Sequence, residues 1–416
     1  MARTGADSLR LLWVKGGKLL PVDTGGKLRS YHLARELSKR HSLTMLSYYR
    51  GRKDAEYESA LSGEFPGAVF VRHGLPGEGR LVDVLDYAAH LFSPAPYAVT
   101  KFTSASVKRL LRQWYREDRF DAVVCDFLSA SLNFDPPLST PTLLFQHNVE
   151  SALWKRQAEH ERNSVVRLIF AMEAAKMERY EPTALRRFHQ VIAVSQHDRQ
   201  LMSQSLDPSR ITVVPTGVDG SRFRVARTST PKQNEVLFLG SMDWEANIDG
   251  AEWFCEKVWP LVRRAVPTAQ LQLVGRNPHA RVRQLASDHV CVTGTVPSVV
   301  EHLASASAVV VPLRIGGGTR LKIYESMAAG RPVISTTVGA EGLEYTAGKD
   351  ILIADTPESF ASAVIDVLGN DELARRLGAA AGALADRHDW SQVVEHFEGA
   401  IATVLRDAEP ERSRRR

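Results

Sequence analysis

The sequence predicts an α/β protein built from two parallel sheets, each covered by helices. Short apolar runs alternate with longer segments of helical periodicity, a pattern typical of parallel strands joined by crossover helices. The alternation occurs twice, on either side of a join expected at 211–223, which the polar segment 228–234 follows, so we expect two domains. The chain has 416 residues, of which 44% are hydrophobic, and this is enough for the cores of two or three domains.

The expected elements follow this alternation. In the first half, strands are expected at 9–14, 42–48, 122–125, 142–146 and 191–194, and helices at 27–40, 101–116 and 151–187. In the second half, strands are expected at 236–239, 271–274, 290–292, 308–311 and 332–335, followed by a last helix at 390–405. The domains are therefore predicted to span residues 1–212 and 213–389, with a terminal helix and a basic tail at 390–416.

The segment 308–335 carries the strongest functional signal. An apolar strand is followed by three glycines and then by a helix whose apolar residues recur at helical spacing. Glycines leave backbone N–H groups open to a ligand, and the N-terminus of a helix favours negative charge, so this arrangement suits a phosphate. The residues predicted to bind a diphosphate there are Gly317, Gly318, Thr319, Arg320 and Lys322.

Lys322 and Glu325 are three residues apart and share one face of that helix. The spacing puts the cation near the phosphate site and the carboxylate one turn deeper, where it suits a ribose diol. Two plainer interpretations stay open. The glycines can form only a tight connection, and the two charges can be a solvated pair.

A second glycine turn, Gly25-Gly26, lies between the first strand and the first helix. In a parallel sheet such a loop emerges at the carboxyl ends of the strands, where ligands bind, so both glycines are candidate diphosphate contacts. The turn lacks the Gly-x-Gly-x-x-Gly spacing of a dinucleotide site, which counts against NAD. An ordinary turn is the alternative interpretation.

His147 and Glu150 are the candidate catalytic residues, because they follow the predicted strand at 142–146 and so project from the carboxyl end of a strand. A neutral imidazole can donate a hydrogen bond to a bound substrate or accept one from a substrate hydroxyl near pH 7. The alternative is a helix start in which Asn148 is the cap and His147 is a satisfied polar residue.

These segments together resemble the donor site of the retaining glycosyltransferases of family 4, which have the GT-B fold. Glu325 matches the second glutamate of the family's pattern, and Gly317 stands at the position of the first, so the chain resembles the subgroup with a Gly-Gly-Gly-Thr-Arg-Leu-Lys segment. The resemblance implies two Rossmann-like domains with parallel sheets that face a central cleft. It makes 1–212 the acceptor-binding domain and 213–389 the nucleotide-sugar-binding domain, with the terminal helix returning to the first.

The resemblance also implies which loops lie near the nucleobase: those that contain Gly240, Arg276, Thr295 and Val296. Many family members carry an arginine and a lysine in the loop that corresponds to 240–247, and this chain has neither. We therefore expect the positive charge for the diphosphate to come from the cations that follow the glycine turn.

The expected function is that of a retaining glycosyltransferase that moves a hexose from a nucleotide-diphosphate sugar to a glycan or lipid-linked acceptor, in cell-surface or exopolysaccharide biosynthesis. Two alternatives stay open. One is a sugar-nucleotide epimerase of the same fold, and the other is a catalytically silent glycosyltransferase-like subunit, which the missing first glutamate makes credible.

Several motifs are absent from the sequence. It contains no Asp-x-Asp, Cys-x-x-Cys, His-Glu-x-x-His, P-loop or Gly-x-Ser-x-Gly, and its three cysteines show no metal-ligand spacing. We therefore expect no metal site and no cofactor, so that backbone amides, a helix dipole and two cations stabilise the leaving diphosphate.

The net charge of +5 falls to +2 without the tail 411–416, so nucleic-acid binding is not expected. No apolar run approaches 18 residues and no secretory signal is apparent, so we expect a cytoplasmic protein. Basic residues with interleaved aromatic residues cluster at 101–119 and 179–187. They indicate either a solvated helix face or peripheral association with the inner face of a membrane, where a lipid-linked acceptor resides.

Overall fold

The computed structural model of the chain describes residues 8–73, 80–161, 163–315 and 320–413. The chain forms two compact units, unit 1 (Met1–Pro215 and Val393–Arg416) and unit 2 (Thr216–Gln392). The first boundary falls at Pro215 rather than at residue 212, because Ile211–Val213 forms an edge strand of the unit 1 sheet. The second falls after Gln392 rather than 389, since Asp389 and Trp390 still pair with Val218 of unit 2.

Unit 1 is built on a seven-stranded parallel sheet in the order β3-β2-β1-β4-β5-β6-β7. The strands are β1 (Arg10–Gly16), β2 (Ser42–Arg50), β3 (Val69–His73), β4 (Ala122–Asp126), β5 (Thr142–Phe145), β6 (Gln190–Ala193) and β7 (Ile211–Val213). Every residue of β4, β5 and β6 is buried, as expected for central strands covered on both faces.

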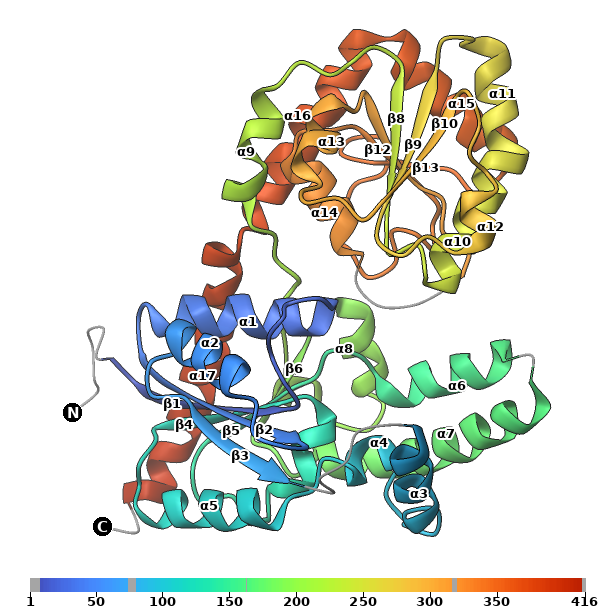
Figure 1. Cartoon of the computed structure of the whole chain (residues 1–416). Coiled ribbons are helices and arrows are strands. Elements are labelled where there is room, and N and C mark those ends of the chain that lie inside the picture. Colours follow the sequence, from blue (N-terminus) through green and yellow to red (C-terminus); the bar gives the residue numbers. More distant parts are fainter. Residues whose placement is uncertain (1–7, 74–79, 162, 316–319, 414–416) are drawn as a thin grey trace. The chain divides into compact units, whose positions relative to one another are not determined.

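Helices lie on both faces of this sheet (Figure 1). They are α1 (Gly25–Ser38), α2 (Ala55–Glu64), α3 (Arg80–Ala89), α4 (Tyr97–Thr100), α5 (Ala105–Arg116), α6 (Glu150–His160), α7 (Ser164–Leu185), α8 (Gln196–Met202) and α17 (Trp390–Ser413), with short 3₁₀ turns η1 (Leu128–Asn133) and η2 (Pro208–Arg210). Helix α17 joins the core through Phe397, whose ring stacks on Trp13 with centroids 5.4 Å apart.

The single helix expected at 151–187 is wrong in one respect: the segment forms two helices, α6 and α7, packed as a hairpin (Figure 1). The break occurs because Asn163 caps the second helix. Its side-chain oxygen accepts from the backbone N–H groups of Val165 and Val166, which satisfies donors that a helix start leaves unpaired.

Unit 2 repeats the plan with a six-stranded parallel sheet in the order β10-β9-β8-β11-β12-β13. Its strands are β8 (Glu235–Leu239), β9 (Gln270–Val274), β10 (Val290–Gly294), β11 (Ala308–Val311), β12 (Val333–Ser335) and β13 (Leu352–Ile353). Its helices are α9 (Gly220–Thr228), α10 (Glu245–Trp253), the π-helix η3 (Phe254–Val258), α11 (Trp259–Ala265), α12 (Ala280–Arg283), α13 (Val300–Ser305), α14 (Leu321–Ala328), α15 (Pro357–Gly369) and α16 (Asp371–Arg387).

The predicted two-sheet α/β architecture is confirmed. The sequence patterns missed three strands, β3, β7 and β13, which are short and lie at or near an edge of a sheet. In the part of the chain that the structure describes, no helix combines the length and the apolar character that crossing a membrane requires.

Candidate functional site

In each sheet, successive strands are added first on one side of the first strand and then on its other side. Ligands of open α/β sheets bind beside the point where this order reverses. In unit 2 this point lies between β8 and β11. The segment 240–247 follows β8, and α14 follows β11 along the chain. The topology of unit 2 therefore brings together two segments that the sequence singled out independently.

Lys322 joins these two segments directly. Its ammonium group on α14 donates a hydrogen bond to the side-chain oxygen of Asn247, with Nζ and Oδ1 2.7 Å apart, and lies 5.0 Å from the ring centroid of Phe238. Burial above all, and then the nearby charge of Arg320, lower the pKa of Lys322 to about 7, while the charge of Glu325 opposes the shift. With this pKa, the lysine is protonated in about half of the molecules at neutral pH. A bound anion favours the protonated form.

Arg320 is the residue immediately before α14 and is 4% exposed. Its guanidinium carbon lies over the ring of Trp244, 5.4 Å from the ring centroid. Two cations thus stand at the beginning of α14, where the helix dipole also favours an anion. The predicted diphosphate contacts Gly317, Gly318 and Thr319 lie outside the described residues.

Glu325, the predicted ribose ligand, is half-buried one turn along α14. Burial raises the pKa of its carboxyl, and the charges of Arg222 and Lys322 partly offset this. Lys322 bonds to Asn247 and both side chains are half-buried, so Lys322 and Glu325 are not the solvated pair that the spacing allowed. The carboxylate is surrounded by positive charges, and its oxygens can accept hydrogen bonds from hydroxyl groups.

The loop 240–247 is held by close backbone packing. A Cβ atom at Gly240 would lie 2.7 Å from the Asn247 side chain, and one at Gly275 would lie 1.5 Å from the carbonyl oxygen of Gly240. Glycine is therefore required at both positions. Asn247 in turn donates to the carbonyl of Ser241 (2.8 Å), which orients its Oδ1 toward Lys322.

The predicted nucleobase-proximal residues are only partly brought together. Arg276 reaches the 240–247 loop, where its Nε donates to the hydroxyl of Ser241 at 2.6 Å. Thr295 is exposed just after β10, and Val296 packs against the core of unit 2. Among the described residues no hydrogen bond joins Thr295 or Val296 to Gly240 or Arg276, and their part in base binding stays a prediction.

In unit 1 the strand order reverses between β1 and β4, and a buried polar cluster lies at the carboxyl ends of these strands. Asp126, fully buried at the end of β4, accepts hydrogen bonds from Trp13 Nε1 (3.0 Å) and His147 Nε2 (2.8 Å) and pairs with Lys15 Nζ (3.4 Å). Burial alone would raise the pKa of Asp126, but the Lys15 charge and the His147 and Trp13 hydrogen bonds lower it to about 2.

The imidazole of His147 is fully enclosed in this cluster. Burial lowers the pKa of His147 to about 4 against the opposing effect of Asp126, so the ring is neutral at pH 7. Because Nε2 donates to Asp126, Nδ1 is the acceptor, and it lies 3.4 Å from Nη1 of Arg29. His147 thus meets the description of a satisfied polar residue in this structure, and its catalytic role stays a prediction.

Gly25 and Gly26 form the first turn of α1 rather than a free loop, and Thr24 is the cap. Gly26 also has a packing role, which an ordinary turn would not require. A Cβ atom there would lie 2.4 Å from the ring of Phe127, which stacks on His147 with centroids 3.7 Å apart. Phe127 itself has φ of 73°, a conformation that non-glycine residues rarely adopt and that is common at functional sites.

Glu150 begins α6, and Asn148 is not the cap of that helix, contrary to the alternative that the sequence left open. The carboxylate of Glu181, on α7, accepts instead from the backbone N–H groups of Glu150 (2.9 Å) and Ser151 (3.0 Å) and from Gln146 Nε2 (2.6 Å). Burial and the Glu181 charge raise the pKa of Glu150 to about 7. A carboxyl with this pKa can exchange protons near neutral pH.

Sequence patterns missed Lys15, Asp126, Glu181 and Trp244. Lys15 and Asp126 carried a usable signal, because each is a charged residue within or at the end of an otherwise apolar strand. Glu181 carried none, since its partners lie about 30 residues away and are reached only through the α6–α7 hairpin.

Comparisons with known proteins agree with this architecture. The model of Glycosyltransferase Family 4 matches residues 25–222, and that of Glycosyl transferases group 1 matches residues 233–370. The first match lies almost wholly in unit 1 and the second within unit 2. The chain therefore carries the two domains of a family 4 glycosyltransferase with the GT-B fold.

Over 227 residues the chain is 30% identical to the phosphatidyl-myo-inositol mannosyltransferase of Mycobacterium tuberculosis, an alignment covering 51% of this chain and 59% of the relative. It is 24% identical over 284 residues to an uncharacterized 44.6 kDa protein in the cps region of Klebsiella pneumoniae. That alignment covers 65% of this chain and 71% of the relative. The chain thus spans less than two thirds of the mannosyltransferase's length.

Among solved structures, Anabaena Alr3699/HepE in complex with UDP and glucose superposes with a TM-score of 0.62 at 14% identity, over 95% of this chain and 99% of that one. At this identity the likeness shows the shared fold.

Proposed function

We propose that the protein is a retaining glycosyltransferase that moves a hexose from a nucleotide-diphosphate sugar to a glycan or lipid-linked acceptor. The observation that carries this proposal is the cluster at the strand-order reversal of unit 2, where Lys322 bonds to Asn247 (2.7 Å) and Arg320 lies beside them at the start of α14. Two cations at a helix N-terminus suit a diphosphate leaving group, and Glu325 one turn deeper suits the ribose.

The relatives support the substrate classes. The mannosyltransferase is named for a sugar of the hexose class and a lipid acceptor, and the Anabaena protein binds UDP and glucose. The Klebsiella relative comes from a cps region, which fits a role in cell-surface or exopolysaccharide biosynthesis.

In the proposed reaction, the bond between the anomeric carbon and the phosphate oxygen breaks while the acceptor oxygen bonds to the same carbon. Arg320 and Lys322 stabilise the negative charge that develops on the diphosphate. The acceptor attacks from the face that the nucleotide leaves, its proton passes to the departing phosphate oxygen, and the anomeric configuration is retained.

Incubation of the purified protein with a panel of nucleotide sugars tests the proposal. Thermal shift identifies the donor that binds, and a glycosyltransferase should hydrolyse that donor slowly without an acceptor. An epimerase would convert the sugar while leaving the diphosphate attached. A silent subunit would bind or ignore the donor without releasing nucleoside diphosphate.

The acceptor site is proposed to lie on unit 1. A hollow of about 900 Å³ opens there between α6, α7 and α8, and its lining begins at Val149 and Ser151, beside the candidate residue Glu150. Its other lining residues mix small apolar side chains such as Ala171 with charged ones such as Lys155, which suits an amphipathic acceptor.

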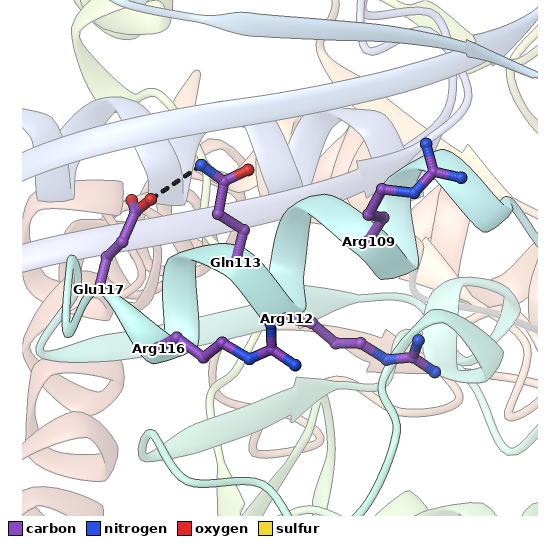
Figure 2. A pocket seen from close by; sticks show the side chains of 5 residues that line it. All are labelled: Arg109, Arg112, Gln113, Arg116 and Glu117. Carbon is purple, nitrogen blue, oxygen red and sulfur yellow. Dashed lines mark hydrogen bonds between the residues drawn. The ribbon is translucent and has the colours of Figure 1, made fainter.

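A lipid-linked acceptor requires contact with a membrane surface, and α5 is the proposed contact. Arg109, Arg112 and Arg116 line an open hollow of about 480 Å³ along the solvent side of this helix (Figure 2), opposite its buried residues. Arg112 pairs with Asp135 (2.7 Å). Exposed arginines on an amphipathic helix are attracted to anionic lipids.

The double variant Arg109→Ala/Arg116→Ala should lower binding to phosphatidylglycerol vesicles on the order of thirtyfold, because each cation near an anionic surface contributes about 1 kcal/mol. Cosedimentation measures this. The matched control is Arg375→Ala/Arg376→Ala, which removes two exposed arginines from unit 2. Equal losses in the two double variants would refute a specific role for α5.

We also expect activity without a divalent metal, because Arg320 and Lys322 supply the positive charge that a metal would otherwise bring to the diphosphate. In the described ranges, no group of three or more His, Cys, Asp or Glu residues is arranged to hold a metal ion. Turnover should survive excess chelator. Complete loss that added magnesium or manganese restores would show that this expectation is wrong.

Glu325→Gln should weaken binding of a nucleoside diphosphate more than binding of inorganic pyrophosphate, since only the former carries a ribose. Loss of a charge-assisted hydrogen bond costs about 1.5–3 kcal/mol, or roughly tenfold to a hundredfold in affinity. Calorimetry with both ligands measures the difference. Equal losses would assign Glu325 a structural role.

A further inference from the structure

Trp244 occupies a position where helix formation favours a different residue. It is the N-cap of α10, and its side chain makes no capping hydrogen bond. Serine, threonine, aspartate and asparagine are preferred there because they satisfy an unpaired backbone N–H. The indole is also 41% exposed. A large aromatic residue that neither caps the helix nor enters the core departs from the local rules, and such departures concentrate at functional sites.

The indole does contact the candidate diphosphate site. Arg320, at the start of α14, places its guanidinium over the ring, with 5.4 Å between the guanidinium carbon and the ring centroid. This distance is within the range of a cation–π interaction. Arg320 is 4% exposed, so it is enclosed by protein groups of which the indole is one.

The backbone of Trp244 is tied to the second cation of the site. The N–H of Asn247 donates to the carbonyl of Trp244 at 2.9 Å, and the side chain of Asn247 accepts from Lys322 at 2.7 Å. The first turn of α10 therefore contacts Arg320 through an aromatic ring and Lys322 through an amide. These contacts fix both cations relative to one rigid element.

We propose that Trp244 is a positioning residue of the diphosphate site, and that its ring holds the guanidinium of Arg320 in the orientation that binds phosphate. This inference rests on the proposed function. The cation–π contact itself uses none of the guanidinium's N–H donors, whose planar fork matches the geometry of a phosphate. A cation held in this way loses less conformational freedom when the ligand binds, which strengthens binding.

The test compares the wild-type chain with Trp244→Ala and Trp244→Phe in calorimetric titrations with inorganic pyrophosphate and with a nucleoside diphosphate. Trp244→Ala should weaken binding of both ligands about fivefold, because both contain the diphosphate that Arg320 binds. Trp244→Phe keeps an aromatic face and should stay within about twofold of the wild type.

Unchanged affinity in Trp244→Ala would overturn this inference and leave the proposed function intact. A loss confined to the nucleoside diphosphate would also overturn it, since the ring would then act on the base or ribose. Failure of the wild-type chain to bind either ligand would instead refute the proposed function, and the inference with it.

A further variant separates positioning from fold stability. Trp244→Asn supplies a preferred helix cap, so its melting temperature should equal or exceed that of the wild type while its pyrophosphate affinity falls as in Trp244→Ala. A lower melting temperature for Trp244→Asn would assign the ring to stability and overturn the inference. Val225→Ala, which truncates another exposed apolar side chain of unit 2, should change neither quantity.

Discussion

Replacement of Lys322 by alanine should weaken binding of the nucleotide-diphosphate donor tenfold to a hundredfold. The variant removes the ammonium group that lies 2.7 Å from Asn247 at the start of α14. Loss of a charge-assisted hydrogen bond to phosphate costs about 1.5–3 kcal/mol. Calorimetric titration measures the change, and unchanged affinity would remove Lys322 from the site.

The same lysine should make donor binding depend on pH. Burial lowers the pKa of Lys322 to about 7, so the free protein carries this charge below pH 7 and loses it above. Because a bound diphosphate favours the charged form, affinity should be highest below pH 7 and should fall as the pH rises to 8. At pH 8 the complex should form with uptake of a proton, which titrations in buffers of different ionisation enthalpy detect.

Lys322→Arg is the matched control for this dependence. An arginine stays charged throughout this range, so the variant should bind the donor with an affinity that changes little between pH 6 and 8. A nucleotide sugar is the preferred ligand, since its diphosphate has no terminal group that titrates near pH 6. An equally steep pH dependence in wild type and Lys322→Arg would assign the effect to another group.

Replacement of His147 by alanine should lower turnover per folded molecule about 100-fold while donor affinity stays nearly constant. The reason is that His147 belongs to unit 1, whereas the candidate donor site belongs to unit 2, and general acid–base groups typically contribute a factor of this size. Nε2 is committed to Asp126, whereas the contact of Nδ1 to Arg29 is long at 3.4 Å, so Nδ1 is the ring atom that we expect to meet the substrate.

Because the imidazole is fully buried, melting temperature must be measured on the same preparation. His147→Gln retains an N–H donor that can reach Asp126, so it should preserve more stability than His147→Ala yet show the same loss of turnover. A variant that is destabilised but active would show that His147 only supports the fold. The pKa of about 4 adds a second expectation, namely that protonation of His147 affects activity near pH 4 rather than near pH 6.5.

Much of the fold was predictable because central strands and amphipathic helices leave local patterns. The run Ala308–Val311 is apolar because β11 is covered on both faces, and the expected strand coincides with the observed one. The edge strand β13 has two half-buried residues and therefore no such pattern. The break between α6 and α7 depends on a cap at Asn163 within a charged stretch, where helical periodicity is weak.

The sequence by itself determined the fold class, the two sheets and the candidate donor segment from Arg320 to Glu325, since these depend on residues close together along the chain. Only the tertiary structure decided which distant residues meet them. Lys322 bonds to Asn247, 75 residues earlier, and Arg320 contacts Trp244. Likewise Asp126 bonds to His147, and the ring of Phe127 packs so closely on Gly26 that a Cβ atom there would clash. Such pairings follow from strand order, because neighbouring strands in a parallel sheet bring together loops that the intervening helices separate in sequence.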